Sequence, residues 1–239
     1  MACDTGVLDL HDDLTCVTSA AGPESGDGIA VDATCRTEET GGTSGPRHLE
    51  VNSHTGFTTE DLPTGQEAVA VATLINEISI PEAPASGGSD VLPVQIATEV
   101  NWSGVLLAAG VNSTFAQVVA TLQARDMETN EVVASNTFLF ERVDADLTLN
   151  VIDALEGMDL TNSSGADITA LMKRGRTYRI EVEAKCHVSV PLMGAALCTF
   201  IDSPVGLPGA DDLLGGDGFD VKSITVTVAG DPVETLLGN

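Results

Sequence analysis

One segment near the C-terminal end limits the fold most strongly. Between Thr177 and Val190, every even position holds an apolar side chain and every odd position a polar or charged one. Successive side chains of a β-strand point to opposite faces, whereas those of a helix repeat about every 3.6 residues. A period of two sustained over this whole segment therefore predicts a long strand with one buried face and one wet face.

Further strands are expected along the chain, because short apolar or alternating runs recur between turn signals. They cover Ala68–Ile80, Val91–Trp102, Phe115–Arg125, Glu131–Phe140, Ala195–Phe200 and Val221–Val228. The third and fourth of these form the clearest hairpin, since Asp126–Asn130 supplies a turn between them. About seven or eight strands predict an all-β fold, an antiparallel β-sandwich or jelly-roll-like barrel.

One or two short helices are expected at about residues 150–175. Val151–Leu155 suggests one helical turn, and Ala166–Arg174 suggests another, with Ile168, Leu171 and Met172 at helical spacing. Gly175 follows as a stop signal. The basic cluster Lys173–Arg176 is expected to complement the helix dipole at that end.

The two ends of the chain differ in composition. Residues 1–66 are rich in Gly, Ser, Thr, Asp and Pro and contain only short apolar stretches. We expect this segment to be an irregular N-terminal arm that serves assembly, with a disordered tail as the alternative. Residues 67–239 are expected to form the β-sandwich domain.

The charge of the chain indicates its surroundings. Its 239 residues include 36 Asp and Glu against 10 Lys and Arg, a formal net charge of −26, yet 43% are apolar and mean hydropathy is +0.16. A chain this apolar should fold, and its surface must then be acidic. Salt screens such repulsion, so we expect a protein adapted to high salt, with an ordinary acidic soluble protein as the alternative.

The same charge excludes one class of partner. Nucleic-acid phosphates need clustered Lys and Arg, so we expect no nucleic-acid binding. No run of about 18 apolar residues occurs, so no membrane insertion is expected. Met1–Gly6 has neither a basic nor an apolar signal-peptide region, so we expect synthesis in the cytoplasm unless a leader precedes the given sequence.

Five cysteines leave the redox setting open. Cys186 and Cys198 are the disulfide candidate, because the turn after the long strand can bring the second cysteine back beside the first. Buried free thiols are the alternative.

Two stretches have side chains suited to cations. The acidic, glycine-rich loop that holds Asp211, Asp212, Asp217 and Asp220 suits a hard cation such as Ca²⁺ or Na⁺, with a solvated loop as the alternative. His48, Glu50, Asn52 and His54 would share one face of a strand and form the other cluster, although the polar face of any exposed strand looks similar. No other cofactor is expected.

No catalytic or nucleotide-binding motif occurs in the sequence, so we expect no enzyme. In composition and strand pattern the chain resembles small β-barrel capsid and decoration proteins of viruses of halophilic hosts. That resemblance implies a virion subunit, in a capsid, decoration or fibre, whose partners are copies of itself or other assembly proteins. The alternative is a secreted or surface-anchored filament subunit or binding module, for which the sequons at Asn101, Asn112 and Asn162 would matter.

Overall fold

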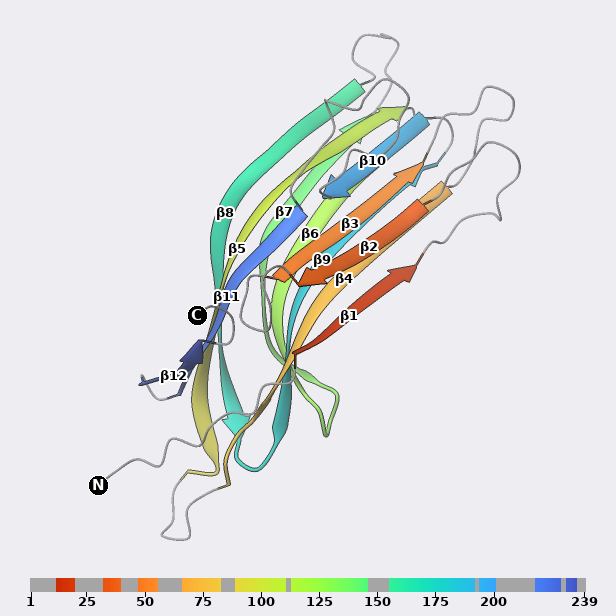
Figure 1. Cartoon of the computed structure of the whole chain (residues 1–239). Helices are drawn as coiled ribbons and strands as arrows, with labels where there is room; N and C mark the ends of the chain where they lie inside the picture. Colours follow the sequence, from red (N-terminus) through yellow and green to blue (C-terminus); the bar gives the residue numbers. More distant parts are fainter. Residues whose placement is uncertain are drawn as a thin grey trace.

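A computed structural model describes the chain in ten stretches. They are residues 12–19, 32–39, 47–55, 66–82, 89–110, 113–145, 155–191, 194–200, 218–228 and 231–235. All regular structure in these stretches is β-strand (Figure 1). The strands are β1 Asp12–Ser19, β2 Asp32–Glu39, β3 Arg47–Thr55, β4 Gln66–Ser79, β5 Val91–Gly110, β6 Thr114–Asp126, β7 Val132–Ala145, β8 Leu155–Lys173, β9 Thr177–Val190, β10 Gly194–Phe200, β11 Gly218–Val228 and β12 Asp231–Thr235.

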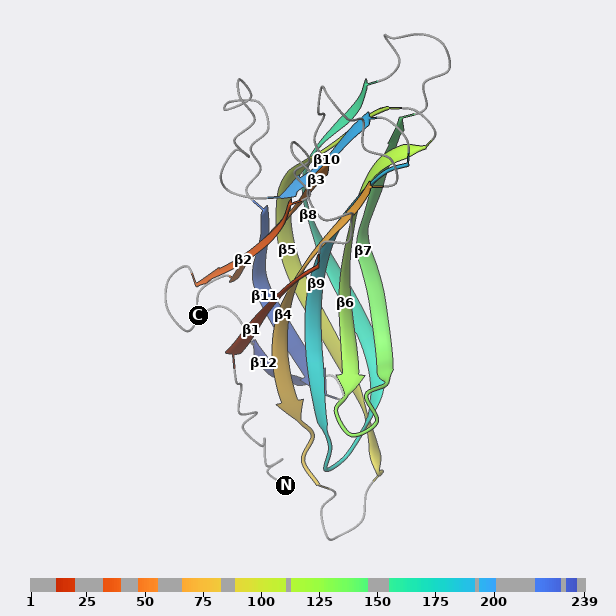
Figure 2. The same ribbon diagram turned by 90° about the vertical axis from the view of Figure 1, so that its right-hand side faces the viewer.

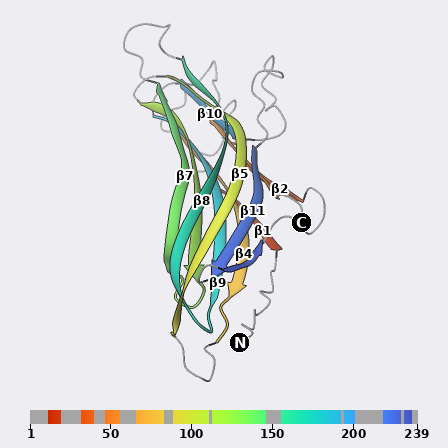
Figure 3. The same cartoon turned by 90° about the vertical axis from the view of Figure 1, so that its left-hand side faces the viewer.

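The strands form two antiparallel sheets that pack face to face, as Figures 2 and 3 show from opposite sides. Sheet A has the order β1-β4-β9-β6-β7. Sheet B has the order β12-β11-β3-β10-β5-β8, with β2 paired to the free edge of β3 and β11 also paired to β5. The expected all-β sandwich is confirmed.

The connectivity is that of a jelly roll. From β3 to β10 the chain places β3, β10, β5 and β8 side by side in one sheet, and β4, β9, β6 and β7 side by side in the other. This order is the eight-stranded double Greek key. Strands β1 and β2 then extend the two sheets beyond β4 and β3.

Strands β10 and β11 occupy one strand position in sheet B. Thr199 lies opposite Val105 and Gly218 lies opposite Ser103, so Phe200 takes the place opposite Gly104. The register on β3 agrees, since Phe200 pairs with Val51 and the next inward residue, Phe219, pairs with Leu49. The chain therefore leaves a single strand after Phe200 and rejoins it at Gly218, and residues 201–217 are an insertion into that strand.

The core lies between the sheets and is filled mainly by aliphatic side chains from the even positions of β5, β6 and β9. Two aromatic rings on the interrupted strand, Phe200 and Phe219, stack there with centroids 4.8 Å apart. A disulfide joins Cys186 on β9 to Cys198 on β10, with Cα atoms 5.6 Å apart. The two cysteines face each other across the core, because their strands belong to opposite sheets.

The helix expected at Ala166–Arg174 is wrong, because this stretch belongs to strand β8. Ala166, Ile168, Ala170 and Met172 point into the core at a period of two, and Leu171, which suggested helical spacing, is 69% exposed. Most of the expected helix at Val151–Leu155 lies outside the described residues. Across the described stretches, we find no helix with the length and hydropathy needed to cross a membrane.

The segment expected to be an N-terminal arm supplies three strands to the sheets. Strand β3 lies inside sheet B, between β2 and the interrupted strand. Its Leu49 and Val51 are fully buried in the core. Their short apolar run gave little sequence signal, because β3 gains its stability from pairing with distant strands.

Candidate functional site

The outer face of sheet B holds a buried polar cluster on strand β3. Cross-strand partners share a face, and Ser53 of β3 donates a hydrogen bond to the carbonyl of Cys186 across the core, so odd positions of β3 point inward. His48, Glu50 and Asn52 therefore point outward, yet their exposed fractions are only 6%, 6% and 3%. Outward side chains of a strand are usually wet, so their burial marks this face as unusual.

Strand β11 brings a second carboxylate to this cluster. Asp220 is the cross-strand neighbour of His48, and its Oδ1 lies 2.9 Å from His48 Nδ1. On the other side of the ring, His48 Nε2 lies 3.6 Å from Glu50 Oε1. Lys222 Nζ lies 3.6 Å from Asp220 Oδ2. The imidazole of His48 thus lies between two carboxylates, that of Glu50 on its own strand β3 and that of Asp220 on β11.

Gly218 makes room for the imidazole. Its φ of +73° is in the left-handed region, and a Cβ on it would lie 2.9 Å from both Cε1 and Nε2 of His48 and 2.8 Å from the carbonyl oxygen of Leu49. Only glycine combines that backbone with such a close approach. The ring of His48 therefore lies directly over the point where the interrupted strand resumes.

Three side-chain atoms of this face have unmet hydrogen-bonding capacity. His48 Nε2, Asn52 Oδ1 and Thr199 Oγ1 are buried and lack a hydrogen-bond partner within the described residues. Thr199 is the cross-strand neighbour of Asn52 on β10. A buried polar atom without a partner costs roughly 1–3 kcal/mol, so each of these three atoms could accept a further hydrogen bond or ligand.

The acidic loop expected to bind Ca²⁺ or Na⁺ is only partly described. Asp211, Asp212 and Asp217 lie outside the described residues, so that hypothesis stays a prediction. Asp220 is described, and it contacts His48 and Lys222. No three His, Cys, Asp or Glu side chains in the described stretches are placed to share one metal ion.

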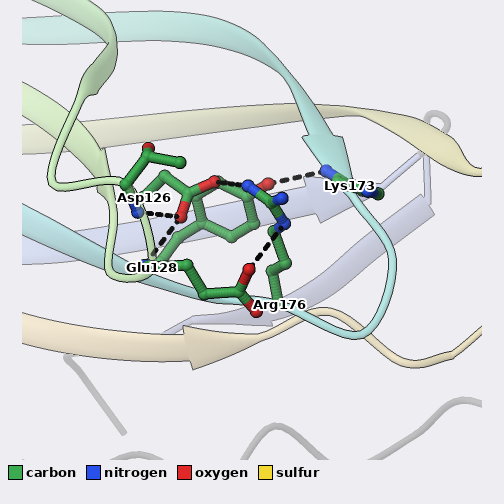
Figure 4. Close-up of polar contacts among 6 residues, drawn as sticks. Asp126, Glu128, Lys173 and Arg176 are labelled. Atoms are coloured by element: carbon green, nitrogen blue, oxygen red, sulfur yellow. Dashed lines mark hydrogen bonds and ion pairs between the residues drawn. The ribbon is translucent and has the colours of Figure 1, made fainter.

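A second polar cluster lies at the turn end of the sandwich (Figure 4). Arg176 contacts Asp126 at 2.5 Å and Glu128 at 3.2 Å, and Asp126 Oδ1 accepts hydrogen bonds from the backbone N–H groups of Glu128 and Thr129. The Tyr178 hydroxyl accepts a hydrogen bond of 2.7 Å from the backbone N–H of Lys173. These contacts tie the β6–β7 turn to the β8–β9 turn.

This geometry also corrects the expected role of the basic cluster Lys173–Arg176, which has no helix to complement. Arg174 donates to the carbonyl of Ser89 at 3.0 Å, and Arg176 binds Asp126. Burial of the Asp126 carboxyl opposes its ionisation. The hydrogen bonds from Arg176 and the two backbone N–H groups outweigh burial and lower the pKa of Asp126 below the ordinary 3.8. The basic cluster therefore joins the β8–β9 turn to the β6–β7 turn and to the chain just before β5.

Sequence reasoning found part of the outer-face cluster. The alternation on β3 correctly placed His48, Glu50 and Asn52 on one face. Asp220 was named for a different reason, as one of the aspartates of the acidic loop expected to bind Ca²⁺ or Na⁺. Sequence reasoning missed that Asp220 meets His48, because 172 residues separate them. It also did not place Thr199 beside Asn52. The only sequence signal for Thr199 was the alternation of β10, which indicates a face of the strand but no partner.

Comparisons with known proteins leave the chain without a family. No protein-family profile matches it, and no curated protein matches it. One similar solved structure is TmCBM61 in complex with β-1,4-galactotriose, at 12% identity and a TM-score of 0.23, covering 72% of this chain and 85% of that one. Another is the enzymatically active domain of tailspike protein 4 of bacteriophage CBA120, at 12% identity and a TM-score of 0.20, covering 82% of this chain and 19% of that one. Scores this low support no argument about function.

Proposed function

We propose that this chain is a non-catalytic structural subunit of an assembly adapted to high salt, most concretely a capsid, decoration or fibre protein of a virus with a halophilic host. Jelly rolls recur in viral capsid domains but also in lectins and cupins, so the architecture is an analogy and not evidence of function. The observation on which the proposal rests is an exposed apolar patch on an otherwise acidic protein.

The patch lies where the edges of the two sheets meet. Asn136 of β7 donates a hydrogen bond of 3.1 Å to the carbonyl of Asp167 on β8. Strands β7 and β8 contact each other and lie side by side in Figure 3. From that contact, Val132 and Val133 lie toward the β6–β7 turn and Leu171 lies toward the β8–β9 turn. Arg176 and Asp126 join these two turns. The side chains of Val132, Val133 and Leu171 are exposed, as is that of Val91 of the neighbouring strand β5. We call Val91, Val132, Val133 and Leu171 the lateral patch. Association of two copies through it would remove these four apolar side chains from water.

The distribution of charge supports the setting in high salt. Every arginine whose side chain is described is already held by a neighbour: Arg125 by Glu181, Arg142 by Asp144, Arg174 by backbone carbonyls, Arg176 by Asp126 and Arg179 by Glu77. These arginines are thus occupied within the molecule, and two copies that each carry a net charge of −26 repel each other as they approach. Salt that screens this repulsion would allow the lateral patches to meet.

Light scattering after size exclusion tests the proposal. The wild-type chain should form defined oligomers in ~1 M NaCl and dissociate at low salt, where the Debye length exceeds about 10 Å. The double variant Val132→Asp/Leu171→Asp should stay monomeric at molar salt, because association would bury its new carboxylates. Ser113→Asp is the matched control, since Ser113 is exposed and its φ of 62° suits Asp. A wild-type monomer at all salt and protein concentrations contradicts the proposal.

The second candidate is a secreted or surface-anchored filament subunit or binding module. The Cys186–Cys198 disulfide favours an oxidising location, which fits an exported protein as well as a virion. Fractionation of the source culture separates the two candidates. Particles that contain the chain support the virion subunit, whereas a mature N-terminus produced by leader cleavage supports export.

A further inference from the structure

We propose that His48 and Glu50 bind a first-row transition metal ion of the Zn²⁺ class on the outer face of sheet B, and that Asp220 orients the imidazole for this purpose. The proposal does not depend on the assembly function. It rests on the orientation of one buried ring and on what faces its second nitrogen.

The contact with Asp220 fixes how His48 presents its nitrogens. A carboxylate only accepts hydrogen bonds, so at 2.9 Å from Asp220 Oδ1 the Nδ1 atom of His48 must donate. In the neutral imidazole the lone pair then lies on Nε2. A carboxylate that holds the far nitrogen of a metal-binding histidine is the usual support of such ligands, because it sets the tautomer and makes the ring a better donor.

The lone pair of Nε2 faces a second acceptor. Glu50 Oε1 lies 3.6 Å away, which is too long for a hydrogen bond, and His48 Nε2 has no hydrogen-bond partner within the described part of the chain. Two ligand atoms that are each about 2.1 Å from one zinc ion lie about 3.4 Å apart at a tetrahedral angle. The observed separation therefore suits a metal ion between the nitrogen and the carboxylate.

The surroundings favour a partly hydrated ion. His48 and Glu50 are both more than nine-tenths buried, and no third His, Cys, Asp or Glu among the described residues is placed to complete the site. Water molecules would then fill the remaining positions. Metal-bound water donates hydrogen bonds, and Asn52 Oδ1, the next outward position along β3, is a buried acceptor that lacks a donor in the described stretches.

The chemistry of the ligands decides the class of ion. Ca²⁺ and Mg²⁺ take oxygen ligands, whereas imidazole nitrogen suits Zn²⁺, Cu²⁺, Ni²⁺ and Fe²⁺. This site differs from the Ca²⁺ or Na⁺ loop expected from the sequence, because Asp220 supports the ligand instead of binding the ion.

Zinc titration of the full chain tests the site. Protein stripped with EDTA is titrated with ZnCl₂ by isothermal calorimetry in ~1 M NaCl, where screening suppresses loose binding to surface carboxylates. The wild type should bind one Zn²⁺ per chain. His48→Ala and Glu50→Gln should abolish saturable binding, and Asp220→Asn should weaken it by about 10–100-fold, the usual effect of losing the supporting carboxylate.

His187 provides a matched control. It also pairs with a carboxylate, Glu67 Oε1 at 2.6 Å, but on the exposed face of sheet A. His187→Ala should leave the titration unchanged, and an equal loss of binding in this variant would overturn the proposal. So would a wild-type chain without saturable Zn²⁺ binding.

A spectroscopic measurement keeps the test independent of variants that fail to fold. In ¹⁵N-labelled wild-type protein at neutral pH, the Nε2 resonance of His48 should shift when ZnCl₂ is added. The Nδ1 resonance should keep the chemical shift of a protonated nitrogen. If Nε2 already carries a proton and does not respond to Zn²⁺, His48 is an imidazolium held between Glu50 and Asp220, and no metal site exists.

Discussion

Phe200 and Gly104 face each other on adjacent strands, and the ring of Phe200 fills the space where residue 104 would carry a side chain. A Cβ on Gly104 would lie 2.4 Å from Phe200 Cδ1 and 2.5 Å from the carbonyl oxygen of Thr199. The ring cannot move easily, because it stacks on Phe219 in a fully buried position. Because Gly104 has no side chain, the ring of Phe200 can pack against β5 at the end of β10, where the chain leaves the sheet.

Gly104→Ala should lower the free energy of unfolding by about 1–3 kcal/mol, the usual cost of overpacking a core. Chemical denaturation in molar salt measures the loss. Gly165→Ala is the control, since its Cβ would meet only the carbonyl oxygen of Thr98 at an ordinary 3.4 Å. That variant should stay within about 0.5 kcal/mol of wild type, and equal losses in both variants would contradict the packing argument.

Asp126 makes a further prediction at the residue scale. Asp126→Asn should cost about 1–2 kcal/mol of unfolding free energy, because it removes the charge that Arg176 and two backbone N–H groups hold. Glu128→Gln should cost less than about 1 kcal/mol, since its carboxylate is 58% exposed and water screens its pair with Arg176. Urea melts of the two variants compare the costs.

The pH dependence follows from the lowered pKa of Asp126. A carboxyl whose pKa is lower in the folded state stabilises the protein above its unfolded value of 3.8 and loses that contribution as pH falls through its lowered pKa. The stability difference between wild type and Asp126→Asn should therefore be constant above about pH 5 and shrink below 3.8. A difference that persists in strong acid would exclude this origin.

At the scale of elements, the sequence predicts strands well and their partners poorly. The alternation of β9 and the turn between β6 and β7 are local signals, and both predictions are confirmed. Strand β8 was missed because one exposed residue, Leu171, imitates helical spacing. The joint strand position of β10 and β11 could not be predicted, since it depends on register with β3 and β5 across residues 201–217. The same non-local register hides the contact between His48 and Asp220.

The position of β3 yields a prediction about truncation. Deleting residues 1–55 should abolish cooperative unfolding, because it removes the strand between β2 and the interrupted strand, with Leu49 and Val51 of the core. Deleting residues 1–11 leaves every described strand and serves as the control. Differential scanning calorimetry in molar salt distinguishes the variants. A folded chain without residues 1–55 would support the expectation of a separate arm and a sandwich domain that begins at residue 67.

At the scale of the whole molecule, two features of the chain oppose each other. Its jelly roll buries an aliphatic core that drives folding in water. Its net charge of −26 opposes compaction, and the described arginines, all engaged locally, offer little further compensation. The balance between core burial and charge repulsion depends on salt, because the Debye length falls from about 10 Å at 0.1 M salt to about 3 Å at 1 M.

The melting temperature should therefore rise continuously from low to molar NaCl. A charge-swapped variant provides the matched comparison. Glu99→Lys, Glu131→Lys and Asp167→Lys change three exposed carboxylates and leave the ion pairs of Arg125, Arg176 and Arg179 intact. With less self-repulsion to screen, this variant should melt higher than wild type at low salt and respond less steeply to added NaCl. Both chains should approach the same melting temperature at molar salt, where screening removes most of the difference in self-repulsion between them. If the wild type melts at the same temperature in all salt concentrations, its acidic surface is no adaptation to salt, and the proposed setting fails with it.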